Sequence, residues 1–358
     1  MNLTSQIQEC RACRSNELNE IFVIENVVLT GVFPKISDQY LNVNDMTLLA
    51  CGGECGLVQL KQIPSPENMY GDNYGYRSGL NVSMIDHLKF RVNEAESIVN
   101  LDKNDCILDI GSNDATLLNH YSCKGINKIG FDPSAGKFKQ YYKDDTTLIV
   151  DFFSANELKK ITDQKLKIIT SISMFYDLPD PLEFVKNISE VLHPEGIWIT
   201  EQSYLFAMLD TNSFDTICQE HLEYYSITAI KWILDKADLK IINVEFNDIN
   251  GGSVCITTAH KSNIKLKEYG QLSSLLEKEK EKELNAEFQN FRTNIENIRH
   301  QLLQLIQNTK DKGGRVFGLG ASTKGNTLIQ HFKLSTDHIE SIGEVNPEKM
   351  GRYTPGTG

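Results

Sequence analysis

The sequence lacks a long apolar run, a hydrophobic leader and an excess of positive charge. No segment approaches the roughly 18 apolar residues of a membrane-spanning helix, and the first ten residues, MNLTSQIQEC, have no signal-peptide core. Acidic residues outnumber basic ones by 48 to 36, a formal net charge of −12. A polyanion such as nucleic acid needs a basic partner surface. We therefore expect a cytoplasmic protein that binds neither membranes nor nucleic acid.

Two common nucleotide-binding patterns are absent as well. After the apolar run Cys106–Ile110, Gly111 is followed by Ser112-Asn113-Asp114, so the G-x-G-x-x-G of a dinucleotide fold is missing. Near the end of the chain Lys324 precedes Gly325 instead of following it, which excludes a Walker loop. A cofactor with a ribose but no pyrophosphate fits the first turn better, and S-adenosylmethionine is the leading candidate.

The eight cysteines are unevenly placed. Cys10, Cys13, Cys51 and Cys55 form two closely spaced pairs, whereas the other four are scattered through mixed segments. In a reducing compartment such pairs indicate a metal site, and four thiolates suit structural zinc. The alternative is that these cysteines are free and incidental.

The stretch 106–118, CILDIGSNDATLL, is typical of a strand, a tight turn and a helix start. Ligands bind at the carboxyl ends of strands in such sheets, so Asp109, Gly111 and Asn113 are expected to face the cofactor. Asp132 closes the next strand and is placed to accept the ribose hydroxyls. We expect Asp151, Phe152 and Met174, which follow later strands, in the same pocket. The simpler interpretation of Asp109 and Asp132 is solvated strand ends.

The alternation of strands and helices over residues 101–260 predicts one doubly wound domain. With 358 residues, two or three domains are expected. We therefore predict an α/β protein with a doubly wound central domain.

Two segments carry side chains suited to substrate chemistry. Residues 70–79, rich in tyrosine and glycine, predict either a polar pocket that includes Tyr76 or a plain surface linker. The segment Cys218–Ser226 contains Glu220-His221, and a histidine tuned by a carboxylate suits acid–base catalysis. The alternative for this pair is a surface or core position without chemistry. Asn250 lies in a further tight turn, N-G-G-S.

The last hundred residues predict a long helix followed by an incomplete α/β unit. One apolar stripe runs over about 265–309, and it indicates a helix that braces two domains or, alternatively, a dimerising coiled coil. We therefore expect a monomer, with a dimer as the alternative. The turn with Ser322 and Lys324 is suited to an anionic group such as a diphosphate, or its glycines serve only close packing. This unit stops after two strands, which predicts a layer shortened naturally or by truncation.

Taken in order, these motifs resemble the nucleotide-sugar C-methyltransferases that build branched deoxysugars. The resemblance spans essentially the whole chain and rests on the cysteine pairs and the motifs Y-R-S-G, ILDIGSND, GFDPS, MFYDL, EQSY, DTICQEHLEYYS, NGGS and VFGLGASTKGNT. It implies a zinc-binding domain at 1–75, a class I methyltransferase (Rossmann-like) domain at 76–262 and a C-terminal Rossmann-like domain at 263–358. It also implies an active site between the domains and a 4-keto-6-deoxy sugar on a nucleoside diphosphate as the substrate. Gln219 departs from the family, which commonly has histidine there, and the last domain is unfinished.

The resemblance also implies roles for individual residues. His221 is the general base at C3 of the sugar, Glu220 orients or tunes it, and Tyr76 donates to the resulting enolate. Tyr224, Asn250, Ser322 and Lys324 join Tyr76 in binding the substrate. The alternatives are an O- or N-methyltransferase, in which no carbon acid forms, and a binding protein without catalysis.

Overall fold

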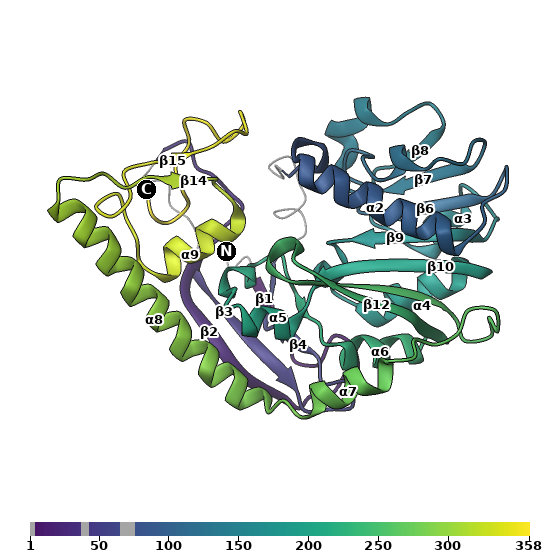
Figure 1. The fold of residues 1–358 in the computed structure, drawn as a ribbon, viewed down its shortest axis with the longest axis horizontal. Helices are drawn as coiled ribbons and strands as arrows, with labels where there is room; N and C mark the ends of the chain where they lie inside the picture. Colours follow the sequence, from purple (N-terminus) through teal and green to yellow (C-terminus); the bar gives the residue numbers. More distant parts are fainter. Residues whose placement is uncertain (1–3, 37–42, 65–75) are drawn as a thin grey trace.

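The computed structural model describes residues 4–36, 43–64 and 76–358. Residues 70–75 of the predicted tyrosine-rich loop lie outside the described residues. Figure 1 shows a large sheet with helices on its faces, a C-terminal lobe opposite it, and the N-terminal strands below and between the two. None of the described helices has both the length and the apolarity needed to cross a membrane.

The large sheet has seven strands in the order β12-β13-β10-β9-β6-β7-β8. All neighbours pair in parallel except at β13, which is antiparallel to both β10 and β12. This is the predicted class I methyltransferase fold. The strands span β6 Cys106–Ile110, β7 Asn127–Phe131, β8 Thr146–Ile149, β9 Leu166–Ile172, β10 Leu192–Ser203, β12 Leu239–Asn247 and β13 Ser253–His260.

Helices cover both faces of this sheet, and their first turns are closed by polar side chains. Asn81, Ser154, Asp180 and Ser226 each accept a hydrogen bond from a backbone N–H of the helix that follows. These helices are α2 Val82–Ile98, α3 Ala155–Lys159, α4 Pro181–Val191 and α6 Ile227–Asp235, with α5 Leu205–Asp210 beside them. Short 3₁₀ turns are η1 Ser78–Leu80, η2 Leu118–His120, η3 Ala135–Tyr141, η4 Phe175–Asp177, η5 Phe214–Thr216 and η6 Ile249–Gly251.

The N-terminal part forms a smaller antiparallel sheet in the order β11-β4-β3-β2. It contains β2 Leu18–Val28, β3 Val43–Cys51 and β4 Val58–Leu60, while β1 Thr4–Gln6 pairs with β5 Gln62–Pro64. Its fourth strand, β11 Glu223–Tyr224, comes from the middle of the chain. The predicted doubly wound domain over residues 101–260 therefore has an exception at β11, which begins two residues after His221 and joins the other sheet.

The predicted single helix over 265–309 is instead two helices, α7 Leu272–Lys280 and α8 Leu284–Asp311. The apolar stripe of α8 packs within the chain, because Phe288 and Phe291 lie 6.1 and 5.3 Å from Phe22 of β2, ring centre to ring centre. Figure 1 shows α8 running along β2 towards the C-terminal lobe. The helix thus braces the N-terminal sheet, as the first of the two alternatives predicted.

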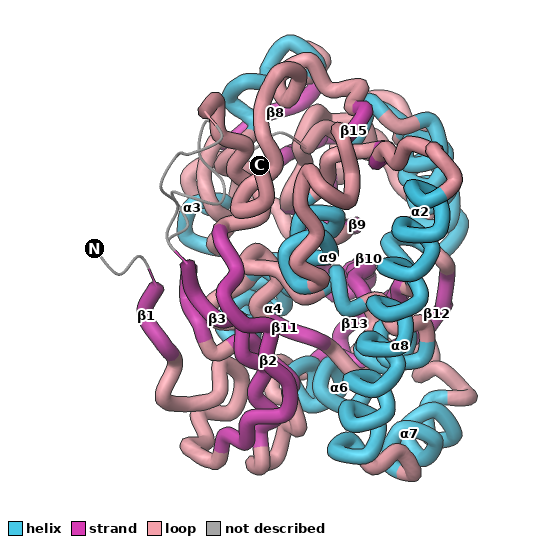
Figure 2. The backbone as a smooth tube through the Cα atoms, turned by 90° about the vertical axis from the view of Figure 1, so that its left-hand side faces the viewer, coloured by secondary structure: helices cyan, strands magenta, loops and turns pink. Residues whose placement is uncertain are grey.

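The C-terminal lobe consists mostly of loops around α9 Thr323–His331, as Figure 2 shows. Its two strands, β14 Gly318–Leu319 and β15 Ile342–Gly343, pair in parallel. Each of these strands is only two residues long. Ser322 caps α9 by accepting a hydrogen bond from Gly325 N, 2.9 Å away.

Candidate active site and metal cluster

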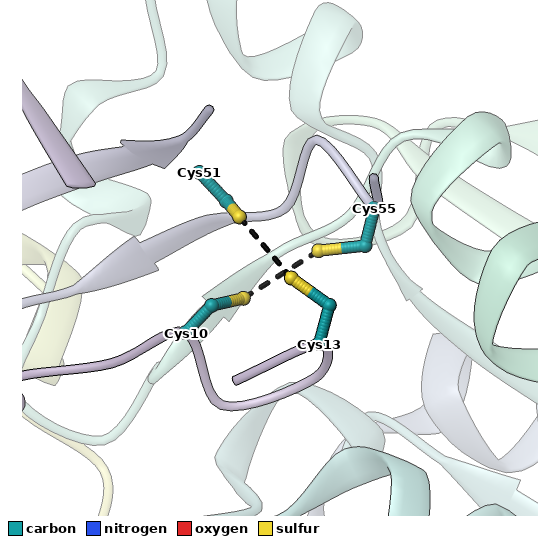
Figure 3. Close-up of side chains that lie close together, drawn as sticks. All are labelled: Cys10, Cys13, Cys51 and Cys55. Atoms are coloured by element: carbon teal, nitrogen blue, oxygen red, sulfur yellow. Dashed lines mark hydrogen bonds between the residues drawn. The ribbon is translucent and has the colours of Figure 1, made fainter. Parts of the chain in front are cut away.

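The four N-terminal cysteines converge on one point (Figure 3). Their sulfur atoms all lie within 4.8 Å of one another, with 3.5 Å between Cys10 and Cys55 and 3.4 Å between Cys13 and Cys51. Four sulfurs about 2.3 Å from a tetrahedral ion are separated by roughly 3.8 Å, so the spacing fits a metal. The hydrogen bond from Cys55 lowers the pKa of the Cys10 thiol to about 4, and burial raises that of Cys51 to about 12. With its pKa raised in this way, Cys51 keeps its proton at neutral pH unless a cation is bound nearby.

All the predicted cofactor residues line one cavity at the carboxyl ends of β6–β9. They are Asp109, Gly111, Asn113, Asp132, Asp151, Phe152 and Met174. Gly111 has φ +74°, and a Cβ there would lie 3.0 Å from Met174 Cγ. A glycine is required at this turn because any side chain meets both backbone strain and Met174.

Two of the aspartates that line this cavity, Asp109 and Asp132, are buried. Asp132 accepts hydrogen bonds from Asn113 N at 2.9 Å and from Ser134 N at 2.6 Å, which hold its carboxylate at the turn. Asp109 is bonded to the Thr170 hydroxyl at 2.6 Å. Burial raises the pKa of Asp109 to about 7, an effect that the Thr170 hydrogen bond opposes. Neither aspartate is the solvated strand end of the simpler interpretation.

A second, larger cavity of about 1040 Å³ adjoins the first. Tyr76 and Ser173 line both cavities, so a ligand in one lies beside a ligand in the other. Of the predicted catalytic and substrate residues, the larger cavity is lined by Tyr76, Glu220, His221, Asn250, Ser322 and Lys324. Its cations come from the methyltransferase lobe and the C-terminal lobe, namely Arg77, Lys324, Lys349 and Arg352.

His221 is buried at the wall of this cavity, with its ring 4.1 Å from that of Tyr176. Its Nδ1 lies 2.7 Å from the carbonyl oxygen of Thr216. Because a carbonyl only accepts hydrogen bonds, Nδ1 carries the proton and Nε2 keeps a lone pair. Burial and the nearby Lys324 lower the pKa of His221 to about 3. The imidazole is therefore neutral at physiological pH.

Glu220 also lines the larger cavity but contacts the other side of it. Its carboxyl group is hydrogen-bonded by Thr323 of α9, and a Cβ at Gly31 would lie 2.8 Å from its Oε1. Burial raises the pKa of Glu220 to about 7. The expectation that Glu220 orients His221 is corrected here, because the carbonyl of Thr216 occupies the Nδ1 position.

Comparison with known proteins finds methyltransferases along the chain. Family models match consecutive parts of the chain, a methyltransferase domain at residues 83–244 and a C-methyltransferase C-terminal domain at 248–358. C-methyltransferase NovU of Streptomyces niveus is 24% identical over 362 residues, which covers 99% of this chain and 86% of NovU. The protein is an S-adenosylmethionine-dependent methyltransferase, and its C-terminal part matches the model of C-methyltransferases.

Two solved structures are each similar to about half of this chain. One is a putative methyltransferase in complex with the Haloferax volcanii Trm112 activator, with a TM-score of 0.42, 16% identity, and coverage of 51% of this chain and 94% of that one. The other is magnesium protoporphyrin IX methyltransferase (ChlM) of Synechocystis PCC 6803 with bound SAH. Its TM-score is 0.40 at 11% identity, with coverage of 50% and 88%.

Tyr224, one of the residues predicted to bind substrate, lies away from both cavities. Tyr224 is 3% exposed and packs in the apolar core between the N-terminal sheet and α8, outside the lining of both cavities. The reason is β11: once Glu223 and Tyr224 pair with β4, the side chain of Tyr224 faces the core of that sheet. The prediction that Tyr224 binds substrate is therefore corrected.

The sequence reasoning missed a stretch of the N-terminal part, residues 28–34, which we call the strap. Gln219 accepts from the Thr30 hydroxyl at 2.9 Å and donates to the Val28 carbonyl at 3.2 Å. From the C-terminal lobe, Asn326 donates to the Thr30 carbonyl at 2.6 Å, and Gln330 accepts from Val28 N at 2.8 Å. The strap thus forms one side of the larger cavity. Gln219 joins parts of the chain rather than relaying protons, and no local motif signals this.

Proposed function

We propose that this enzyme methylates C3 of a 4-keto-6-deoxy sugar linked to a nucleoside diphosphate, through an enolate. The observation that carries the proposal is a neutral histidine in a large cavity that adjoins the cofactor cavity. A carbon next to a ketone must lose a proton before it attacks a methyl group, so this reaction needs a base beside the methyl donor. The relative NovU is a C-methyltransferase, which supports the same choice.

The lining of the smaller cavity fits S-adenosylmethionine. Asp132 is positioned for the ribose hydroxyls, Asp109 places a buried carboxyl where a cation is bound favourably, and Phe152 and Met174 supply apolar surface. Bound S-adenosylmethionine supplies an electrophilic methyl group on a positively charged sulfur. In the cysteine cluster we propose zinc, with a structural role because four cysteines leave no open coordination position.

In the proposed reaction, His221 Nε2 removes the proton from C3 of the sugar. The C3–H electron pair forms the C3=C4 bond, and negative charge develops on O4. The hydroxyl of Tyr76, which lines both cavities, donates a hydrogen bond to that oxygen. Holding the sugar in the larger cavity then places C3 towards the cofactor cavity, where proximity accelerates the carbon–carbon bond formation.

Glu220 is the competing base, because a catalytic base works best with a pKa near the working pH. The two candidates differ in pH dependence. Glu220 becomes a carboxylate only as the pH rises through about 7, whereas His221 is already neutral above about 3. A rate that rises tenfold per pH unit below 7 indicates Glu220; a rate that is flat from pH 5 to 8 indicates His221.

The test is solvent deuterium exchange at C3, followed by NMR with a panel of 4-keto sugar nucleotides and no cofactor. We expect exchange in the wild-type enzyme, its loss in His221→Gln, and unchanged S-adenosylmethionine affinity in that variant by calorimetry. With cofactor added, the product should carry a new methyl group on carbon. A methyl on oxygen or nitrogen, or no exchange with any substrate of the panel, would refute the proposal.

A further inference from the structure

We propose that Lys324 of the C-terminal lobe is a positioning residue that fixes His221 as the neutral imidazole with its lone pair on Nε2. The inference rests on the proposed function for its catalytic meaning, although the state of His221 can be measured without substrate. This role differs from the sequence-based expectation that Lys324 contacts a diphosphate, because the ammonium group of Lys324 already donates to two protein acceptors, Asn250 and Thr216.

The first step of the argument is a chain of contacts across three segments. Lys324, in the first turn of α9, places Nζ 2.7 Å from the carbonyl oxygen of Asn250 and 3.4 Å from Thr216 Oγ1. The carbonyl oxygen of the same threonine lies 2.7 Å from His221 Nδ1. Lys324 therefore holds the residue that fixes the histidine tautomer, and the lysine belongs to a different lobe.

The second step is electrostatic. A cation close to an imidazole disfavours its protonation. Burial lowers the pKa of His221 most, and the charge of Lys324 lowers it further. The hydrogen bond to Thr216 has the opposite effect and raises this pKa. Lys324 is itself largely buried, so water screens its charge less than that of a surface lysine.

Other groups around His221 do not replace this cation. Lys349 and Arg352 of the C-terminal lobe and Arg77 of the methyltransferase lobe line the same cavity, but the pKa of His221 responds to Lys324. The other ionisable groups that the described residues place nearby are acids or neutral groups. They are Glu220 and Cys218 on its own segment, Tyr176 with its ring tilted against that of His221, Asp215 near Lys324, and Glu344 and Glu348 in the cavity lining.

The consequence is that His221 has its fixed tautomer only when the C-terminal lobe packs against the methyltransferase lobe. Asn250 and Thr216 come from loops of the methyltransferase lobe, and Lys324 joins them to α9. Displacement of α9 would free Thr216 and remove the cation at the same time. His221 would then gain a proton more readily and lose its fixed tautomer.

The experiment compares Lys324→Met, which removes the charge, with Lys324→Arg, which keeps it. Lys312→Met, at the exposed end of α8 and outside the larger cavity, is the matched control. The first readout is the ¹⁵N spectrum of the histidine side chains at pH 7, with the His221 signals assigned from His221→Asn. We expect one tautomer with the proton on Nδ1 in the wild type, Lys324→Arg and Lys312→Met, and a tautomer mixture in Lys324→Met.

The second readout is the rate of C3 exchange together with steady-state kinetics. We expect Lys324→Met to lower exchange and kcat by about tenfold or more, with an unchanged KM for S-adenosylmethionine and an acid limb shifted to higher pH. Should Lys324→Met fail to fold, the isosteric Thr216→Val removes only the hydroxyl contact and should produce the same tautomer mixture in part.

A wild-type His221 spectrum in both Lys324→Met and Thr216→Val would overturn the inference, and so would the same change in Lys312→Met. The proposed function fails separately. If the wild type shows the Nδ1–H tautomer and its loss in Lys324→Met, but no exchange with any 4-keto sugar nucleotide, the role of Lys324 stands and the sugar chemistry does not.

Discussion

Asp109 shows how one residue links charge to cofactor binding. Its carboxyl is almost fully buried, and burial raises its pKa to about 7. A cationic ligand favours the ionised form, so binding of S-adenosylmethionine should lower this pKa and release a proton near pH 6. We predict that affinity rises from pH 6 to 8, by up to about tenfold per pH unit below the free pKa.

Calorimetry in buffers of different ionisation enthalpy measures both the affinity and the proton released. Asp109→Asn serves as the control, because it removes the titrating group and should flatten the pH dependence. Equal wild-type affinities at pH 6 and pH 8 would contradict the prediction.

Tyr224 gives a second prediction at the scale of one side chain. Because its ring lies in the core and not at a cavity, Tyr224→Phe should leave the KM for the sugar nucleotide and kcat within about twofold of wild type. Tyr76→Phe should lower kcat by about tenfold or more if its hydroxyl stabilises the enolate. Steady-state kinetics of the two variants decide between the observed placement and the substrate role expected from sequence.

Residue by residue, the sequence predicts the cofactor turn better than the substrate cavity. Asp109, Gly111 and Asn113 follow one strand directly, so local spacing places them together. The partner of His221 is a backbone carbonyl, which has no signature in residue type. Tyr224 was misassigned because two residues of pairing with a distant strand turned its side chain into a core.

Among the elements, α8 shows how a heptad-like stripe is used. Phe291 is 1% exposed and packs on Phe22, whereas Leu305 of the same stripe is 64% exposed. Phe291→Ala should therefore lower the free energy of unfolding by about 3–5 kcal/mol, and Leu305→Ala by less than about 0.5 kcal/mol. Denaturant unfolding of both variants tests this packing. Equal losses of unfolding free energy in the two variants would show that Leu305 is also buried, as it would be in the interface of a dimer.

The elements most visible in the sequence are those with strong local signals. Helix α2, Val82–Ile98, is such an element, because its apolar face and its Asn81 cap both lie within the segment or next to it. The strand β12 pairs with β13, α7 packs against α6, and α8 packs against β2, and periodicity reports none of these contacts. The domain limits at 75 and 262 stay predictions.

At the scale of the whole molecule, the cysteine cluster lies beside a sheet that includes β11, so a metal ion bound there would stabilise that sheet. The cysteines join the loop at 10–13 to the turn at 51–55, between β3 and β4, and β4 pairs with β11. We predict that removing the metal lowers the unfolding temperature and also disturbs the active site, since β11 begins two residues after His221.

Mass spectrometry should find one metal ion per chain, lost on Cys10→Ser but kept on Cys123→Ser, a cysteine outside the cluster. Chelation followed by thermal unfolding measures the stability effect. An unchanged unfolding temperature with the metal removed would rule out a structural role.

The strap also constrains how the chain folds. Its hydrogen bond between Val28 and Gln330 closes a separation of 302 residues, and Thr30 pairs with Asn326 across 296. Contacts of such separation form late, since the loop-closure entropy must be overcome first. On the ribosome, the methyltransferase lobe is complete well before α9 is synthesised. The larger cavity therefore takes shape only after α9 has been made, and shorter nascent chains do not yet carry the assembled candidate site.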